Sequence, residues 1–379
     1  MRIAVNTRFL QKNNLEGFGY YIHELLQRIT QQNPQHQFLF VFDRSFDSSF
    51  IYHNNVSAKV VGPKARHPLA FRVWYDISFS KAAKHFKADI ILSLDGFCCL
   101  NTTIPQILAV HDLAYLHYPN YIAWYHLWFY KCYQKKFIEK ATKVITVSNF
   151  SKQDIVQQYH IPNTKINVIY NGIRSCFNPV SYEIKNAVKH DYTNGCEFFL
   201  SVGGIHPRKN IIQLLKAFSL FKKWHQSNMK LVIAGRFAWQ TKIFKQQIET
   251  YKYKADVVLL GYVNDVVLSQ IMASAYALVY PSLFEGFGVP IIEAMQCGTP
   301  VITSNTSSMP EAAGNAALYT NPNDAIDIAN QMKLLYKDEM LRTQLIKKGF
   351  LQAQQFSWDE SALALTKIIE EVAIYKSTI

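Results

Sequence analysis

The chain has 379 residues, of which 49% are hydrophobic and 18% are charged. This length is too great for one hydrophobic core and suits two domains. The composition excludes a disordered chain, and no uninterrupted apolar stretch is long enough to span a bilayer.

The net charge of +13 lies mostly in the first half of the chain. Residues 1–180 contain 20 Lys and Arg against 10 Asp and Glu, a net charge of +10, and the remaining residues contribute +3. Such an excess predicts an anionic partner, either an acidic acceptor or an anionic membrane surface. No nucleic-acid-binding motif accompanies the basic residues, so we expect no nucleic acid among the partners.

The N-terminus and the cysteines predict a cytoplasmic protein. Met1 is followed directly by an apolar strand pattern, without the features of a secretion signal. The six cysteines lack paired metal-ligand spacing, and in the cytosol they are expected to be reduced. The expected location is the cytoplasm, either in solution or peripherally on the inner face of the cytoplasmic membrane.

Short apolar runs alternate with helical patterns along the first half of the chain. The helix after the first strand has Ile22, Leu25, Leu26 and Ile29 at helical spacing, which places them on one face. The predicted strands are 3–6, 38–42, 59–61, 89–93, 106–110, 143–147 and 166–170.

The second half repeats this alternation, and helical patterns dominate residues 322–376. Alternation of strands and helices implies parallel sheets with right-handed crossovers, so the predicted fold class is α/β with two Rossmann-like, doubly wound domains. Their expected ranges are 1–180 and 190–356, with an irregular hinge from Arg174 to Gly195. The predicted strands are 197–202, 229–234, 256–260, 276–280 and 300–303.

Open parallel sheets bind ligands beyond the carboxyl ends of their strands, which makes the loops there candidate sites. Gly17 and Gly19, after the first strand, resemble a short glycine loop that faces phosphate, although two glycines alone are a weak signal. His111 directly follows the strand at 106–110. This position predicts an imidazole that donates to a ligand hydroxyl or positions an acceptor, and the alternative is a structural histidine.

Aromatic and basic side chains crowd the segment 119–140. Aromatic residues beside lysines suit the headgroup zone of a bilayer. The alternative is a core helix with a solvated basic face, and the number of aromatic residues predicts that part of the segment is core. The residues concerned are Tyr121, Trp124, Tyr125, Trp128, Phe129, Tyr130, Tyr133 and Phe137, with Lys131, Lys135, Lys136 and Lys140.

Arg208 and Lys209 lie in the loop that follows the first strand of the second half. Gly203 and Gly204 make the turn. Arg208 can clamp two phosphate oxygens with its planar fork, and Lys209 adds a point charge. Because the loop lies at the carboxyl end of a strand, a phosphate site is favoured over a solvated basic turn.

Two carboxylates stand eight residues apart in the segment Pro281–Met295. A helix is expected to begin near Pro290, since Pro fits the first helical turn, so Glu285 lies in the strand-to-helix loop and Glu293 lies one turn inside the helix. The glycines of Gly286-Phe287-Gly288 let the backbone approach a ligand, and amides at a helix start suit an anionic, hydroxyl-rich ligand. Together these features predict a nucleotide-sugar site.

These motifs resemble those of the retaining glycosyltransferases of family 4, which have the GT-B architecture. The resemblance covers nearly the whole chain, and its most specific mark is the segment from Glu285 to Glu293. It implies two Rossmann-like domains that face a cleft, with the donor nucleotide on the second domain and the acceptor on the first. It also implies that a C-terminal helix at 357–379 completes the first domain. Further motifs that match in order and spacing are 202–204, 208–210, 234–236, 260–263 and 297–301.

The resemblance also implies roles for individual residues. Glu285 would bind donor-sugar hydroxyls near the anomeric centre, and His111 would face that sugar. Arg208 and Lys209 would neutralise the diphosphate leaving group, which completes the expected catalytic set, and Glu293 would hold the ribose. The other donor-binding residues would be Gly17, Gly19, Gly204, Gly235, Tyr262, Val263, Gly286, Phe287 and Gly288. Glu16 replaces a glycine that is common in the family, and its carboxylate is expected to point away from the diphosphate.

The expected function is transfer of a hexose, with a slight preference for mannose from GDP-mannose over glucose from UDP-glucose. The acceptor would be a glycan or a lipid-linked molecule in the synthesis of a cell-surface polysaccharide. No Asp-x-Asp metal motif is evident, so neither a metal nor another cofactor is expected. Two alternatives stay open: a nucleotide-sugar epimerase or hydrolase, which would process the donor without an acceptor, and a non-catalytic nucleotide-sugar or glycan binder.

Overall fold

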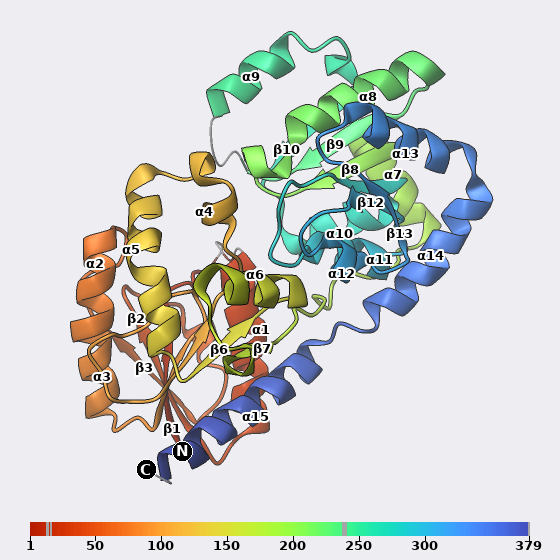
Figure 1. Cartoon of the computed structure of the whole chain (residues 1–379). Coiled ribbons are helices and arrows are strands. Elements are labelled where there is room, and N and C mark those ends of the chain that lie inside the picture. Colours follow the sequence, from red (N-terminus) through yellow and green to blue (C-terminus); the bar gives the residue numbers. More distant parts are fainter. Residues whose placement is uncertain (13–14, 16, 237–240, 378–379) are drawn as a thin grey trace. The chain divides into compact units, whose positions relative to one another are not determined.

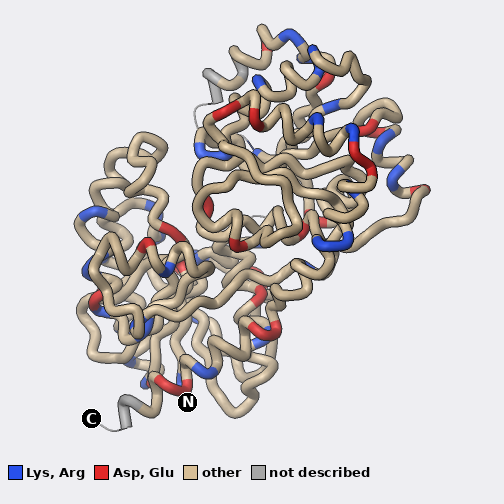
Figure 2. The backbone as a smooth tube through the Cα atoms, turned by 45° about the vertical axis from the view of Figure 1, so that its right-hand side comes forward, with Lys and Arg blue, Asp and Glu red and all other residues tan. Residues whose placement is uncertain are grey.

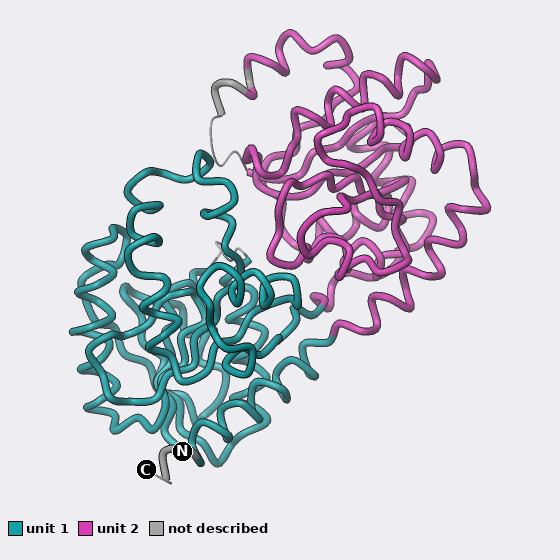
Figure 3. Tube along the Cα trace, in the orientation of Figure 1, with its two compact units in different colours: residues 1–172, 357–379 teal, residues 173–356 magenta. Residues whose placement is uncertain are grey.

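The computed structural model describes residues 1–12, 15, 17–236 and 241–377. The chain divides into two compact units (Figure 3), one formed by residues 1–172 with 357–379 and the other by residues 173–356. Each unit is built on one parallel sheet (Figure 1), which confirms the predicted α/β class. Lysines and arginines occur on both units, with carboxylates among them (Figure 2). No helix in the described ranges is long and apolar enough to cross a membrane.

The first unit contains a seven-stranded sheet with the order β3-β2-β1-β4-β5-β6-β7. Its strand order reverses between β1 and β4, so the loops that follow these two strands meet at the carboxyl edge of the sheet. All seven predicted strands are present, and β3 begins three residues before the predicted Lys59. The strands are β1 (Arg2–Asn6), β2 (Gln37–Phe42), β3 (Val56–Val60), β4 (Ile90–Ser93), β5 (Gln106–Ala109), β6 (Lys143–Thr146) and β7 (Ile166–Val168).

The C-terminal helix α15 (Trp358–Ser377) belongs to this first unit and packs on α1 (Gly17–Gln32). A Cβ at Gly172 would lie 2.4 Å from the Trp358 amide nitrogen, so only glycine allows this close approach. Arg28 on α1 pairs with Asp359 on α15 at 2.7 Å. The other helices are α2 (Pro68–Val73), α3 (Ser80–His85), α4 (Ala114–His117), α5 (Trp124–Lys140) and α6 (Asn149–Tyr159), with a π-helix η2 (Trp74–Phe79) and the 3-10 turns η1 (Ser48–Phe50), η3 (Pro119–Tyr121) and η4 (Asn163–Lys165).

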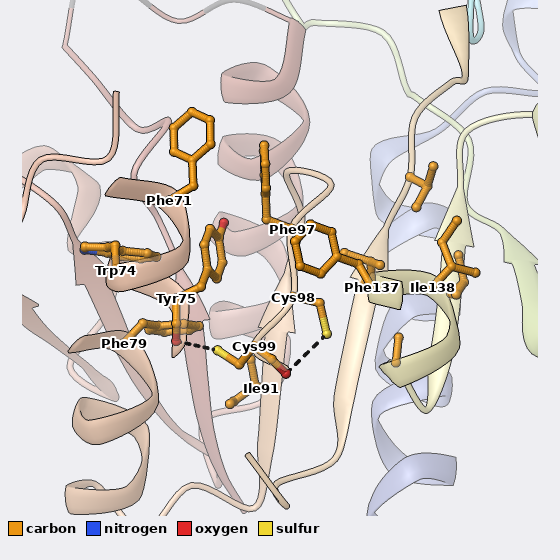
Figure 4. Packing of buried hydrophobic residues seen from close by; sticks show 14 of the residues in the cluster. Phe71, Trp74, Tyr75, Phe79, Ile91, Phe97, Cys98, Cys99, Phe137 and Ile138 are labelled. Atoms are coloured by element: carbon orange, nitrogen blue, oxygen red, sulfur yellow. Dashed lines mark hydrogen bonds between the residues drawn. The ribbon is translucent and has the colours of Figure 1, made fainter. Parts of the chain in front are cut away.

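Aromatic side chains form much of the core of the first unit. Trp74 and Phe79 stack with ring centroids 5.1 Å apart, and Phe71 lies 5.0 Å from Phe97 (Figure 4). Phe137 on α5 lies 6.0 Å from Phe97. One face of the α2–η2 helical run is therefore fixed against the core by large buried rings.

The second unit contains a six-stranded sheet with the order β10-β9-β8-β11-β12-β13. The order reverses between β8 and β11, which are direct neighbours. β13 was not predicted, because its four residues, between Gly314 and Pro322, are too few to show a periodic pattern of apolar residues. The strands are β8 (Phe198–Val202), β9 (Lys230–Ala234), β10 (Val257–Gly261), β11 (Ala277–Tyr280), β12 (Val301–Ser304) and β13 (Ala317–Thr320).

The expectation of an irregular hinge from Arg174 to Gly195 is wrong, because this stretch contains helix α7 (Tyr182–Thr193). The Ser181 hydroxyl caps its start, and Asn194 ends it in a left-handed conformation. α7 buries only Val188 and Thr193, and its packing against α10 stabilises it. The other helices are α8 (Ile211–His225), α9 (Thr241–Glu249), α10 (Asp265–Ser274), α11 (Val289–Gln296), α12 (Met309–Ala313), α13 (Ala325–Lys337) and α14 (Glu339–Ala353), with 3-10 turns η5 (Pro207–Lys209) and η6 (Lys254–Asp256).

Candidate active site

The loops after β8 and β11 are fixed to each other at the carboxyl edge of the second sheet. The Leu283 amide donates to the Arg208 carbonyl at 2.9 Å. The Asn210 side-chain amide donates to the carbonyls of Pro281 and Pro322 at 3.0 and 2.7 Å. Side chains from two distant parts of the chain therefore have defined positions relative to each other at the point where the strand order reverses.

Glu285 lies between the two cations of the β8 loop. Its Oε2 is 3.2 Å from Arg208 Nη1, and its Oε1 is 2.7 Å from Lys209 Nζ. Arg208 also donates to the Phe284 carbonyl at 2.7 Å, and Lys209 donates to the Tyr280 hydroxyl at 2.6 Å. The structure thus brings together three side chains of the expected catalytic set, Glu285, Arg208 and Lys209.

The electrostatics of this cluster keep Glu285 ionised at neutral pH. Burial by itself raises the pKa of Glu285, but the charges of Lys209 and Arg208 outweigh it and bring that pKa to about 2. Glu285 therefore cannot act as a general acid at neutral pH. The two cations exceed the single carboxylate in charge, so the cluster attracts an anionic ligand.

We predict that Glu285→Gln changes stability in a pH-dependent way. The pKa of Glu285 is lowered from 4.5 to about 2 in the folded chain, so its ion pairs stabilise fully above about pH 4.5 and lose their effect as the pH falls toward 2. Thermal unfolding should show a difference in Tm between wild type and variant that is constant from neutral pH down to about pH 5 and shrinks below it. An unchanged difference near pH 2 would contradict the depressed pKa.

Three glycine-containing loops lie together at the ends of β8, β9 and β10. The Gly203 amide donates to the Ala234 carbonyl at 2.9 Å, and the Gly235 amide donates to the Gly261 carbonyl at 2.8 Å. A Cβ at Gly235 would lie 2.0 Å from the Gly203 oxygen and 3.1 Å from the Gly204 nitrogen, so a side chain has no room there. The predicted donor-binding residues Gly204 and Gly235 are therefore adjacent.

Tyr262 and Val263 follow β10 in the same row of loops. Tyr262 is 60% exposed, and Val263 is half-buried. An exposed aromatic ring at this edge offers a flat apolar face to a planar ligand. Their contact with a nucleotide base stays a prediction.

The backbone of Glu285 and Phe287 is held by two serines that were not predicted from the sequence. The Ser308 hydroxyl donates to the carbonyls of Glu285 and Phe287 at 2.8 and 2.9 Å, and the Glu285 amide donates to the Ser307 hydroxyl at 3.0 Å. Gly288 has φ of +108° and directly precedes α11. The helix begins at Val289, one position before the predicted start at Pro290. The serines lie after β12, and no sequence pattern marks them as partners of this loop.

Glu293 is 1% exposed and is paired with Arg174. Both of its oxygens accept from the guanidinium, Oε1 from Nε at 2.7 Å and Oε2 from Nη2 at 2.9 Å. The third nitrogen, Nη1, donates to Asp265 at 2.7 Å, and the Phe177 ring lies 4.5 Å from the guanidinium carbon. The sequence showed Arg174 only as the start of a hinge, and the ribose contact of Glu293 stays a prediction.

In the first unit, His111 follows β5, and its Nε2 lies 2.9 Å from the Leu94 carbonyl. A carbonyl only accepts, so Nε2 carries the proton. Burial lowers the pKa of His111, so the ring is neutral at neutral pH and its Nδ1 is an acceptor. The expectation that His111 donates to a ligand hydroxyl is corrected, because the one N–H of the neutral ring is bound to Leu94. The ring packs against Phe18 and Tyr21, at centroid distances of 4.5 and 4.8 Å.

Gly17 and Gly19 lie in the first turns of α1, near His111 in the same unit. A Cβ at Gly17 would meet open space, whereas a Cβ at Gly19 would lie 3.0 Å from the Phe9 carbonyl oxygen. Gly19 is thus explained by packing, and a phosphate contact for either glycine stays a prediction. Glu16, which was expected to point away, lies outside the described residues.

A buried cluster around Arg8 braces the neighbouring loop and was not predicted. Arg8 Nε lies 2.6 Å from Asp95 Oδ2, and the Tyr75 hydroxyl donates to the same carboxylate at 2.7 Å. Asp95 follows Leu94, whose carbonyl binds His111. The Arg8–Asp95 ion pair therefore helps to fix the Leu94 carbonyl, the acceptor that keeps the proton of His111 on Nε2.

Segment 119–140 is divided between core and surface. Phe129 and Phe137 on α5 are 1% exposed and belong to the core cluster, as predicted for part of the segment. Trp124 and Trp128, at the start of the helix, are 78% and 53% exposed. The exposed aromatic side chains of α5 therefore lie at its beginning, and the exposed lysines follow further along the helix.

Comparisons with known proteins identify the family. Residues 15–175 match the model described as Glycosyltransferase Family 4, and residues 184–352 match Glycosyl transferases group 1. The O-antigen chain mannosyltransferase RfbU of Salmonella typhimurium is 34% identical over 66% of this chain and 67% of its own length. The chain belongs to the family 4 glycosyltransferases.

The O-antigen chain mannosyltransferase B of Escherichia coli is 28% identical over 92% of this chain and 94% of its own length. The Anabaena protein Alr3699/HepE, solved in complex with UDP-glucose, shares the fold with a TM-score of 0.77 and 17% identity over 98% of this chain and 100% of that chain.

The charged side chains at the candidate active site indicate which ligand groups this family 4 glycosyltransferase can bind. Arg208 and Lys209 can bind a diphosphate, and the ionised Glu285 can accept from sugar hydroxyls. Among the residues that the structure describes, no group of three or more His, Cys, Asp or Glu side chains is arranged to hold a metal ion.

Proposed function

We propose that this glycosyltransferase transfers mannose from GDP-mannose to a glycan or lipid-linked acceptor in the synthesis of a cell-surface polysaccharide. Transfer would retain the anomeric configuration and need no metal. The observation that carries the proposal is the meeting of Glu285 with Arg208 and Lys209 at the carboxyl edge where the strand order reverses. The choice of mannose is supported by the two relatives named O-antigen chain mannosyltransferases.

In the proposed reaction, the bond between the sugar C1 and the diphosphate oxygen breaks, and the electron pair leaves with the phosphate. Arg208 and Lys209 stabilise this developing charge, and each such contact contributes about 3–4 kcal/mol to the transition state. Both cations are paired with Glu285, so a bound diphosphate would share them with the carboxylate. Glu285 is then positioned to accept hydrogen bonds from the sugar hydroxyls.

The acceptor hydroxyl attacks C1 on the face that the diphosphate leaves, and its proton passes to a leaving phosphate oxygen. This route needs no protein general acid, which agrees with the low pKa of Glu285, about 2. Neutral His111 would accept from a sugar hydroxyl through Nδ1. Glu293 would accept from the ribose hydroxyls, with Arg174 holding its carboxylate in position.

The proposed partners also include an anionic membrane surface, as predicted for segment 119–140. A lipid-linked acceptor would be presented at such a surface. Because Phe129 and Phe137 are core residues, contact with lipid is assigned to the exposed start of α5.

The test combines donor binding with transfer. GDP-mannose should raise the Tm more than UDP-glucose does, since a ligand of the folded state stabilises it. Mannosyl transfer to an isolated O-antigen-type acceptor should give the same anomer as the donor, measured by NMR, and should persist in EDTA. Consumption of GDP-mannose without an acceptor would instead indicate an epimerase or hydrolase, and binding without turnover would indicate a non-catalytic binder.

A further inference from the structure

The side chain of Lys209 runs closely over Gly203. A Cβ at Gly203 would lie 3.2 Å from Lys209 Cε and 3.6 Å from its Nζ. Gly203 has φ of +131°, a conformation that favours glycine, and its missing side chain leaves room for the aliphatic stem of the lysine. The position of the ammonium group then depends on the groups that accept its hydrogen bonds.

Two acceptors of different charge bind this ammonium. Lys209 Nζ donates to Glu285 Oε1 at 2.7 Å and to the Tyr280 hydroxyl at 2.6 Å. Burial raises the pKa of Tyr280 well above its usual value, so its hydroxyl is neutral at neutral pH. The ionised carboxylate offsets the charge of the lysine, whereas the neutral hydroxyl accepts a hydrogen bond and leaves that charge available to an anionic ligand.

The fold fixes the position of the Tyr280 hydroxyl. Tyr280 is the last residue of β11 and is 2% exposed, so close packing holds its ring in place. Its carbonyl accepts from the Thr303 hydroxyl at 3.0 Å. The carbonyl of the next residue, Pro281, accepts from the side chain of Asn210, which directly follows Lys209. The hydroxyl therefore reaches Lys209 from the end of a buried strand.

We propose that Tyr280 is a positioning residue for the transfer reaction: its hydroxyl holds the Lys209 ammonium where that charge meets the donor diphosphate. This rests on the proposed function, which assigns Lys209 to the leaving group. A lysine has a flexible four-carbon stem, so an acceptor on a rigid strand reduces the number of positions that its charge can take. The alternative is that Tyr280 only fills space in the core, where a phenyl ring would serve equally well.

The test variant is Tyr280→Phe, which keeps the ring and removes only the hydroxyl. We expect kcat/KM for transfer from GDP-mannose to fall about tenfold, the loss that corresponds to one hydrogen bond to a charged group. Inorganic diphosphate, which has neither base nor sugar, should also bind about tenfold more weakly, measured by titration calorimetry.

A double-mutant cycle separates positioning from packing. Lys209→Met removes the ammonium, so adding Tyr280→Phe to this variant should cause no further loss of kcat/KM if Tyr280 acts through Lys209. A further loss of about tenfold in the double variant would show that the hydroxyl acts independently of Lys209, and the proposal would be wrong.

The matched control is Tyr276→Phe. Tyr276 directly precedes β11, at the opposite end of the same strand, and its hydroxyl donates to the Leu335 carbonyl at 3.2 Å. This variant also loses one hydroxyl, yet it should bind diphosphate and transfer sugar as the wild type does. Equal losses in the two variants, wild-type behaviour of Tyr280→Phe, or no binding of diphosphate by the wild type would overturn the proposal. Weaker diphosphate binding by Tyr280→Phe, together with no transfer by the wild type, would support the positioning role and contradict the proposed function.

Discussion

Arg208→Ala is expected to lower the rate of sugar transfer by about 10²–10³-fold, far more than it lowers stability. Arg208 extends from a loop rather than from the core, and its charge is placed to meet the leaving diphosphate. Because this interaction grows as the bond to C1 breaks, kcat and kcat/KM should fall together. Steady-state kinetics with GDP-mannose, together with a thermal unfolding curve, would measure both effects.

The matched control is Lys230→Ala. Lys230 is also paired with a carboxylate, Asp256 at 2.7 Å, but it lies at the amino end of β9, on the opposite edge of the same sheet. That variant should transfer sugar at close to the wild-type rate. Near-normal turnover in Arg208→Ala would remove Arg208 from the mechanism, and an equal loss in both variants would show a general effect on folding.

Arg174→Met is expected to lower the free energy of unfolding by about 3–5 kcal/mol, because it leaves the buried Glu293 carboxylate without its cation. Glu293 is 1% exposed, and both of its oxygens are bound to Arg174. Asp265, the other carboxylate at this guanidinium, is 30% exposed and can be solvated by water. Denaturant unfolding followed by circular dichroism would measure the loss.

A double variant separates the cost of an unpaired charge from the value of the pair. Arg174→Met/Glu293→Met removes both charges and should recover most of the lost stability. Lys135→Met breaks a pair in which both side chains are about half exposed, and it should change stability by less than about 1 kcal/mol. If Arg174→Met is no more destabilising than Lys135→Met, the Glu293 carboxylate is solvated and the buried pair is not important for the fold.

The alternation of strands and helices was readable in the sequence because strands buried on both faces of a parallel sheet appear as short apolar runs. β13 and α7 were missed for different reasons. β13 is too short to show a period, and α7 depends on packing against α10 rather than on its own pattern. Tertiary context decided both.

The amino-acid sequence by itself determined the α/β class, the two-domain organisation, and the chemical character of Glu285, Arg208 and Lys209. These features depend on local composition and on the position of a residue directly after a strand. Both can be read from the order of residues along the chain. Only the tertiary structure decided that the three side chains meet, because β8 and β11 become neighbours through the strand order. It also decided that Arg174 covers Glu293 and that Leu94 binds His111. Such contacts join residues far apart in the chain, and they leave no period or spacing in the sequence.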